Sequence, residues 1–204
     1  MEKESVTEEK IKEAARKVFM EKGYGQARTR DIAEEAGINL ALLNYYFRSK
    51  EKLFDIIMEE SLHEMFHLVT SIVDDKETSL EQKIELIINR YMDSLLENPH
   101  LPLFVLSEIQ ANPKKLLERV GIPDNLIMQS YFYKQIEEQL EKNGMGNMPA
   151  LHFFINMLSM SIFPVVAKPL LMALHGSITN EGYMTFINER RKLIPQWTKA
   201  MLKM

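Results

Sequence analysis

The sequence predicts an all-α fold, with three short helices at the N-terminus followed by a larger helical domain. Apolar residues recur at the three- and four-residue spacing of amphipathic helices along nearly the whole chain. No long stretch alternates between apolar and polar residues, as a half-buried strand would. The eight glycines and eight prolines are sparse and lie between the helical stretches, where they would end helices.

The first predicted helix covers residues 7–22. Ile11, Val18 and Phe19 lie at helical spacing and form one buried face. Gly23 follows this face, and glycine is the residue that most often ends a helix. We therefore expect an amphipathic helix that packs on the elements after it.

Two short helices follow the first one. We expect one helix over 30–36, with Thr29 as its N-cap, and another over 40–47, with Asn39 as its N-cap. Gly37 turns the chain between them. Two short helices joined by a tight glycine turn are a helix-turn-helix, so residues 1–50 are predicted to form a small three-helix domain.

The rest of the chain, residues 51–204, is predicted to form a larger domain of about six helices. A long helix from residue 50 connects the two domains without a flexible linker, and a break is expected near Pro164 and Pro169. The predicted helices cover residues 50–73, 79–98, 102–110, 114–120, 124–144 (capped by Asp124), 149–176 and 181–202.

Composition excludes several classes of protein. The net charge of −4 is unlike that of a protein that coats nucleic acid non-specifically, so any DNA contact must come from a local patch. The chain has no cysteine, which excludes disulfides and thiolate zinc sites. The charged N-terminus lacks the pattern of a secretory signal, and no apolar run reaches the ~20 residues of a membrane span. We expect a cytoplasmic protein.

The helix-turn-helix stretch and the residues around it follow a recognisable pattern. An alanine-glycine turn precedes a leucine, an aromatic pair, a lysine and a second leucine, and a phenylalanine and a glycine stand late in the first helix. These residues are Ala36, Gly37, Leu43, Tyr46, Phe47, Lys50, Leu53, Phe19 and Gly23. Over roughly the first quarter of the chain, the pattern resembles the signature of the tetracycline-repressor (TetR) family of transcriptional regulators.

The resemblance implies a sequence-specific DNA-binding regulator that acts as a homodimer on double-stranded operator DNA. It most often implies a repressor that a small effector molecule releases from the operator. No cofactor, metal or membrane is implied, and the chain is not expected to be an enzyme. A DNA-binding regulator that needs no ligand remains an alternative.

The candidate DNA contacts come from the second and third helices. Leu43 and Phe47 face the first helix, so the opposite face of the third helix can enter a major groove. Asn44 is suited to pair with adenine, and the apolar residues 40–42 are suited to meet thymine methyl groups. The resemblance implies phosphate contacts from Thr29, Tyr46 and Lys50. The predicted set is Thr29, Arg30, Leu40, Ala41, Leu42, Asn44, Tyr45, Tyr46 and Lys50.

Two positions depart from the commonest family pattern. Asn44 stands where a tyrosine is usual, and Leu42 stands where a threonine or serine is usual. Both changes remove a hydroxyl that could bind the DNA backbone. Arg28 and Arg48 add positive charge nearby, while the acidic second helix is expected to face away from DNA.

An effector pocket is predicted in the larger domain. This domain contains more methionine and aromatic residues than an ordinary core of leucine and isoleucine needs. Such side chains suit a cavity that adapts to a mainly apolar ligand. Polar residues among them could orient the ligand. The predicted set is Met65, Phe66, Tyr91, Phe104, Met128, Gln129, Phe132, His152, Phe153, Asn156, Met157 and Met160.

A homodimer interface is predicted on the last two long helices, because the family builds it there and because their apolar faces exceed what one domain needs. Two helices from each subunit would bury these faces. The predicted residues are Phe163, Val166, Leu170, Ile187, Ile194 and Trp197.

An enzymatic alternative rests on His63, Glu64 and His67. They form an HExxH pattern, which on a helix can bind zinc beside a general base. Glu85 could in principle supply a third ligand, but nothing in the sequence singles it out. A helical metal-dependent hydrolase is therefore the alternative to the regulator.

Overall fold

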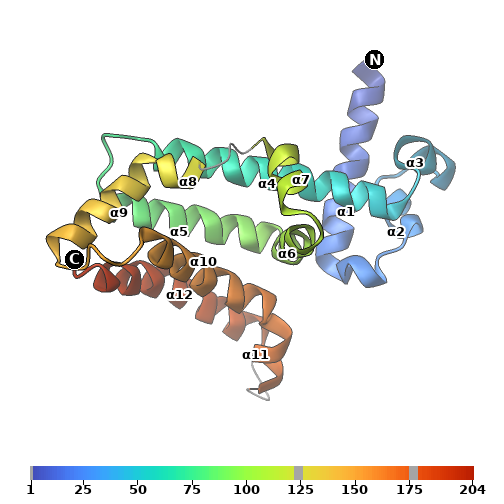
Figure 1. The fold of residues 1–204 in the computed structure, drawn as a ribbon. Helices are drawn as coiled ribbons and strands as arrows, with labels where there is room; N and C mark the ends of the chain where they lie inside the picture. The colour runs from blue at the N-terminus through green and yellow to red at the C-terminus, as the bar shows by residue number, and fades with distance from the viewer. Residues whose placement is uncertain (1, 122–125, 175–178) are drawn as a thin grey trace. The chain divides into compact units, whose positions relative to one another are not determined.

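The computed structural model describes residues 2–121, 126–174 and 179–204, and within these ranges the chain forms helices, turns and loops with no strand (Figure 1). The predicted all-α fold is confirmed. The chain divides into two compact units, Met1–His63 and Glu64–Met204.

The first unit contains three helices and the beginning of a fourth. Their bounds are α1 Glu2–Gln26, α2 Thr29–Glu35, α3 Leu40–Phe47 and α4 Lys50–Val73, of which α4 continues into the second unit. The sequence suggested a border between residues 50 and 51. The unit extends to His63 because Leu53, Ile57 and Leu62 of α4 are buried in it.

The beginnings and ends of α1 and α2 differ from the prediction. The bounds of α1 extend to Gln26, but Gly23 has non-helical backbone angles (φ 73°, ψ 156°) that interrupt the helix where its end was predicted. Thr29 is the first residue of α2 rather than its N-cap. Arg28 takes the N-cap position, and the Asp31 carboxylate accepts a hydrogen bond of 3.0 Å from the Arg28 backbone N–H. A carboxylate in the first turn satisfies a free N–H of the helix end as a cap would.

The turn between α2 and α3 agrees with the prediction. Gly37 has φ +63°, in the left-handed region that glycine adopts without strain. Its N–H donates to Glu34, and the next N–H, of Ile38, donates to Ala33. The Asn39 side chain caps α3 by accepting a 2.8 Å hydrogen bond from the Leu42 N–H. These contacts fix the angle at which α3 leaves α2.

The second unit contains the remaining helices. Their bounds are α5 Leu80–Glu97, α6 Leu101–Ala111, α7 Pro113–Val120, α8 Leu126–Gln129, α9 Tyr131–Lys142, α10 Ala150–Val166, α11 Lys168–Leu174 and α12 Asn180–Met201. Ser79 caps α5 and forms a capping box with Gln82.

Two predicted helical segments of this unit are broken, the first unexpectedly and the second near Pro164 and Pro169, as predicted. The predicted helix 124–144 is divided at Ser130, whose hydroxyl accepts from the Tyr133 N–H and so starts α9 as a new helix. Asp124, its predicted cap, lies outside the described residues. The apolar segment after Pro149 bends by 65° between α10 and α11, at Ala167, while Pro164 lies inside α10.

No single helix in the described ranges is long and apolar enough to cross a membrane. Within these ranges, only α10 and α11 taken together, a pair bent by 65°, have the length and apolar composition of a membrane span.

The core of the second unit lies mainly between α5, α9, α10 and α12. It contains aliphatic and aromatic residues from all four helices, together with one fully buried lysine, Lys83. The buried apolar residues include Ile84, Ile88, Met92, Phe132, Ile136, Leu140, Phe153, Met157, Tyr183, Ile187 and Ile194.

Candidate DNA-binding surface

Helix α3 has a buried and an exposed face. Leu43 and Phe47, four residues apart, are buried in the core of the first unit. Ala41, Asn44 and Tyr45 are exposed on the other side. This division matches the predicted one and follows from the helical repeat.

The exposed face of α3 is mainly apolar. Tyr45 is 73% exposed, and its ring packs edge-on against Tyr46 at 5.4 Å between ring centres. Leu40 and Leu42 are half-buried beside Ala41. Within the part of the chain that the structure describes, the Asn44 carboxamide makes no hydrogen bond, so its donor and acceptor are available to a base edge.

Lys50, predicted as a phosphate contact, binds the end of α1. Its ammonium nitrogen lies 2.8 Å from the Tyr24 carbonyl oxygen and 2.9 Å from that of Ala27. The same nitrogen lies 4.3 Å from the centre of the Tyr24 ring. Two of the three donors of the ammonium are therefore used within the protein, and one remains for a phosphate.

The acidic residues of α2 are paired with lysines of α1. Asp31 lies 3.1 Å from the Lys22 ammonium, and Glu35 lies 2.6 Å from that of Lys17. The pKa of Asp31 is lowered mainly by the hydrogen bond from the Arg28 backbone N–H and, to a smaller extent, by the Lys22 ammonium. These pairs offset the negative charge that would otherwise repel a phosphate backbone.

Cationic and hydroxyl groups flank α3. Arg28 and Arg30 are exposed at the beginning of α2, and Arg48 is exposed directly after α3. Thr29 and Tyr46 are half-buried, as expected for residues that contribute a hydroxyl and also pack. Such groups can hold a phosphate backbone on either side of a helix that enters the groove.

An ion-pair network joins α1 to the first half of α4. The Glu60 carboxylate lies 2.6 Å from the Lys12 ammonium and 2.8 Å from the Arg16 guanidinium. Lys12 is buried and also pairs with Glu9 at 2.5 Å. Burial acts to lower the pKa of Lys12, but the hydrogen bonds to both glutamates outweigh it and raise the pKa. Nothing in the sequence pattern indicated this long-range network.

The predicted effector residues fall into three groups. The first group, fully buried in the second-unit core, consists of Phe132, Phe153 and Met157, with Phe104 at 9% exposure. The second group is half-buried and consists of Met65, Phe66, Tyr91 and Met160. The third group is exposed and consists of Met128, Gln129, His152 and Asn156.

The amide and imidazole members of the predicted effector set, Gln129, His152 and Asn156, are all in the exposed group. In the structure they therefore do not lie among the buried aromatic side chains whose ligand they were expected to orient. Tyr91 is the half-buried residue of the set with a polar group, and burial strongly raises the pKa of its hydroxyl.

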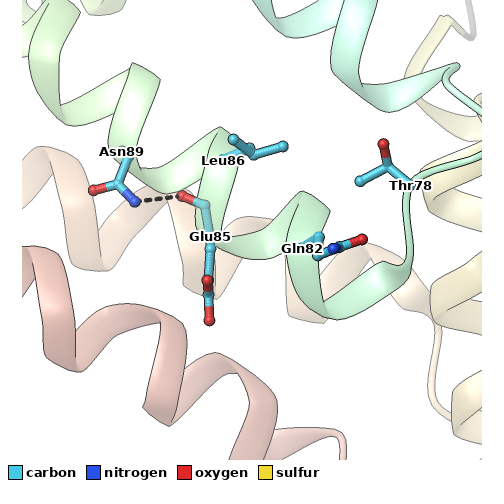
Figure 2. A pocket seen from close by; sticks show the side chains of 5 residues that line it. All are labelled: Thr78, Gln82, Glu85, Leu86 and Asn89. Carbon is cyan, nitrogen blue, oxygen red and sulfur yellow. Dashed lines mark hydrogen bonds between the residues drawn. The ribbon is translucent and has the colours of Figure 1, made fainter.

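A surface depression of about 350 Å³ lies on α5 and the turn before it, apart from the predicted effector residues (Figure 2). Its lining residues, four of them polar, are Thr78, Gln82, Glu85, Leu86 and Asn89. Figure 2 shows the Asn89 amide donating to the backbone oxygen of Glu85, at 2.8 Å.

The predicted dimer residues separate into exposed and buried ones. Phe163, Leu170 and Trp197 are 61%, 53% and 41% exposed, and Val166 is half-buried. Ile187 and Ile194 are fully buried in the core of the subunit. They are therefore unavailable to a partner and are removed from the predicted interface. Their side of α12 faces α5 and α10.

Trp197 is held in place by an arginine. The Arg190 guanidinium carbon lies 5.3 Å from the Trp197 ring centre and 5.7 Å from that of Phe186. One guanidinium nitrogen donates to the Met160 carbonyl oxygen of α10 at 2.9 Å. This contact joins the surfaces of α10 and α12 that the interface prediction invokes.

The HExxH residues do not gather a metal site in the described ranges. His63, Glu64 and His67 are exposed on α4. No group of three or more histidine, cysteine, aspartate or glutamate residues that could hold a metal occurs in these ranges. Glu85, the possible third ligand, pairs with Lys199 at 2.8 Å.

Comparisons with known proteins match the site and the fold. Residues 11–57 match the model of the bacterial regulatory proteins, tetR family. A Bacillus subtilis (strain 168) protein described as a probable HTH-type transcriptional regulator, YttP, is 25% identical over 78% of this chain and 76% of that protein. The fatty acid metabolism regulator protein of the same organism is 25% identical over 54% of this chain and 57% of its own length.

A solved structure shows the same fold over nearly the whole chain. The TetR transcriptional regulator from Legionella pneumophila superposes with a TM-score of 0.55 at 22% identity. The superposition covers 92% of this chain and 94% of that one. The match in fold therefore extends beyond the residues of the family model.

Proposed function

We propose that this chain, whose residues 11–57 match the model of the bacterial regulatory proteins, tetR family, is a repressor that binds its operator as a homodimer and is released by a small, mainly apolar effector. That it is a DNA-binding transcriptional regulator follows from the family. The repressor role, the contacts, the dimer and the effector are the proposal.

The observation that supports the DNA contacts best is the exposed face of α3. A short helix presents an unpaired amide and apolar side chains, and exposed arginines and half-buried hydroxyl residues stand before and after it in the chain. We assign base contacts to Leu40, Ala41, Leu42, Asn44 and Tyr45. We assign backbone contacts to Thr29, Tyr46 and Lys50, while Arg30 can reach a base or a phosphate.

A homodimer is proposed because one eight-residue helix contacts too few bases for tight binding. Two subunits place two copies of α3 in successive major grooves, about 34 Å apart or a multiple of that distance. The exposed Phe163, Leu170 and Trp197 are the apolar side chains that the partner would cover. Large exposed apolar residues close together are typical of protein interfaces.

The effector is proposed to bind next to the half-buried residues of the second unit. Tyr91, Phe154 and Met160 pack on the core cluster without being fully enclosed, and flexible methionine suits a surface that adapts to a ligand. One relative is named a fatty acid metabolism regulator, and a metabolite with a long aliphatic chain would be mainly apolar. By linkage, the factor by which the ligand weakens DNA binding equals the factor by which bound DNA weakens ligand binding.

Selection from random DNA tests this function. The full-length protein is incubated with a random-sequence duplex library at a stated salt concentration, and bound DNA is sequenced after each round. We expect two similar half-sites related by a two-fold axis. A protein that enriches no sequence would contradict the proposed function.

A further inference from the structure

We propose that the base pairs facing α3 in each operator half-site are A·T pairs, recognised mainly through thymine methyl groups and through one adenine that pairs with Asn44. This inference rests on the DNA-binding function proposed above and specifies the class of DNA sequence that the surface fits.

The first step is the chemistry of α3 itself. Its sequence, Leu-Ala-Leu-Leu-Asn-Tyr-Tyr-Phe, contains no charged side chain. Leu43 and Phe47 are buried, so the side chains left to face DNA are aliphatic, phenolic or, in Asn44, a carboxamide. Arginine and lysine, which make the commonest specific contact to guanine, and the carboxylates that accept from cytosine are absent from this list.

The second step compares the base pairs. In the major groove, guanine presents two acceptors that arginine or lysine fills best, and cytosine presents an amino donor that a carboxylate fills best. Against Leu40, Ala41 or Leu42, these polar edges would lose water without gaining a partner. Thymine presents a methyl group, which gains from the same apolar contact.

The third step is the single amide. Asparagine can donate to adenine N7 and accept from its N6 amino group at the same time. The Asn44 carboxamide is exposed and makes no hydrogen bond to the described residues. It lies on the same face as Ala41, one helical turn away, so its adenine belongs to the same run of base pairs.

The fourth step concerns the cations. Arg28 precedes α2 as its N-cap, Arg30 lies on α2, Arg48 directly follows α3 and Lys50 begins α4, so none of these cations lies on α3. They are placed for phosphates or for base pairs beside the run that α3 faces. A guanine at the edge of a half-site, contacted by Arg30, is compatible with the proposal because that pair does not face α3.

The test replaces thymine by deoxyuridine, which lacks only the methyl group. Each thymine of a selected half-site is replaced in turn, and the affinity of the full-length protein is measured. We expect a loss of about fourfold at each thymine that faces α3, the value for burying one methyl group. Replacement outside the run should leave affinity unchanged. The protein itself is not altered, so a folding defect cannot imitate the result.

Two variants connect the effect to named residues. In Leu40→Ala, deoxyuridine should cost less than in the wild type at one position, because the partner of the methyl group is shortened. In the control variant Arg48→Ala, overall affinity should fall while the cost of deoxyuridine stays the same at every position.

The outcomes separate this inference from the function it rests on. Half-sites with G·C pairs facing α3, or deoxyuridine without effect at every position, would overturn the inference and leave the regulator function standing. Enrichment of no sequence at all would overturn both.

Discussion

The Lys50 ammonium group lies over the ring of Tyr24, 4.3 Å from its centre, and donates to the Tyr24 carbonyl oxygen at 2.8 Å. Lys50 is the first residue of α4, and Tyr24 lies near the end of α1. One lysine therefore fastens two helices of the first unit. It does so next to α2, whose first residue, Thr29, is a proposed phosphate contact.

Replacing Lys50 should affect both stability and DNA binding. Lys50→Ala removes two charge-assisted hydrogen bonds, so we expect the free energy of unfolding of the first unit to fall by about 2 kcal/mol. It should also weaken binding to all DNA sequences and flatten the salt dependence of the affinity, because the third ammonium donor can no longer contact a DNA phosphate. Denaturant unfolding and salt titrations of DNA affinity measure the two effects.

Arg48→Ala is the matched control, since Arg48 is exposed and lies two residues away. It should flatten the salt dependence without a comparable loss of stability. If Lys50→Ala unfolded with the free energy of the wild type, the hydrogen bonds from Lys50 to the Tyr24 and Ala27 carbonyl oxygens would not contribute to stability.

Glu60 should be important for the stability of the first unit. Glu60→Gln removes the charge that Lys12 and Arg16 share, and Lys12 is buried. We expect a loss of about 1–3 kcal/mol in the free energy of unfolding. Lys17→Met breaks the more exposed pair with Glu35 and should cost clearly less, because water screens an exposed ion pair. Equal losses in the two variants would contradict the role given to the buried network.

Lys83 should make stability depend on pH in the alkaline range. Burial lowers its pKa in the folded state below the ordinary value of 10.5. The unfolded chain then binds more protons, so the folded state gains stability as pH rises from the folded pKa toward 10.5. The free energy of unfolding of the wild type, minus that of Lys83→Met, should therefore increase with pH over this window.

Lys12→Met serves as the comparison for Lys83. Because the pKa of Lys12 is raised, the stability it contributes is present below 10.5 and is lost only as pH rises through the higher folded value. The free energy of unfolding of the wild type, minus that of Lys12→Met, should stay constant over the pH window in which the difference for Lys83→Met increases. A flat or falling difference for Lys83→Met, measured by denaturant titration at several pH values, would show that its ammonium is not destabilised by burial.

The dimer should depend on the exposed aromatic residues of α10 and α12. Trp197→Asp and Phe163→Asp each place a charge among apolar side chains, so both should raise the dimer dissociation constant and lower operator affinity. Light scattering during gel filtration measures the mass. Leu106→Asp, at a 46% exposed position of α6, should remain dimeric. If all three variants kept the mass of the wild type, the proposed interface would be misplaced.

The sequence predicted the local features of the fold well. Asn39, Gly37 and Ser79 act at the positions expected of them, because capping and turn conformation depend on residues within one helical turn. The α3 faces were predictable for the same reason. The helical repeat alone places Leu43 and Phe47 opposite Asn44.

Most of the errors concern packing between distant residues. Ile187 and Ile194 belong to an apolar stripe, and such a stripe does not tell whether the core or a partner covers it. The contacts of Lys50 with Tyr24 and of Glu60 with Lys12 join residues that are far apart in the sequence. No short motif marks them. The break at Ser130 escaped prediction because a serine inside a helical pattern can also be an ordinary surface residue.

The most direct test of the central claim, that α3 gives this protein its DNA sequence preference, is the affinity of wild type and Asn44→Ala for a selected operator and its single-base-pair variants. The wild type should prefer the operator over random DNA by at least about a thousandfold. Asn44→Ala should lose about 1–3 kcal/mol of discrimination at one base pair of each half-site and keep it elsewhere. An Asn44→Ala variant that loses the same affinity on every sequence, or a wild type without preference, would contradict the account.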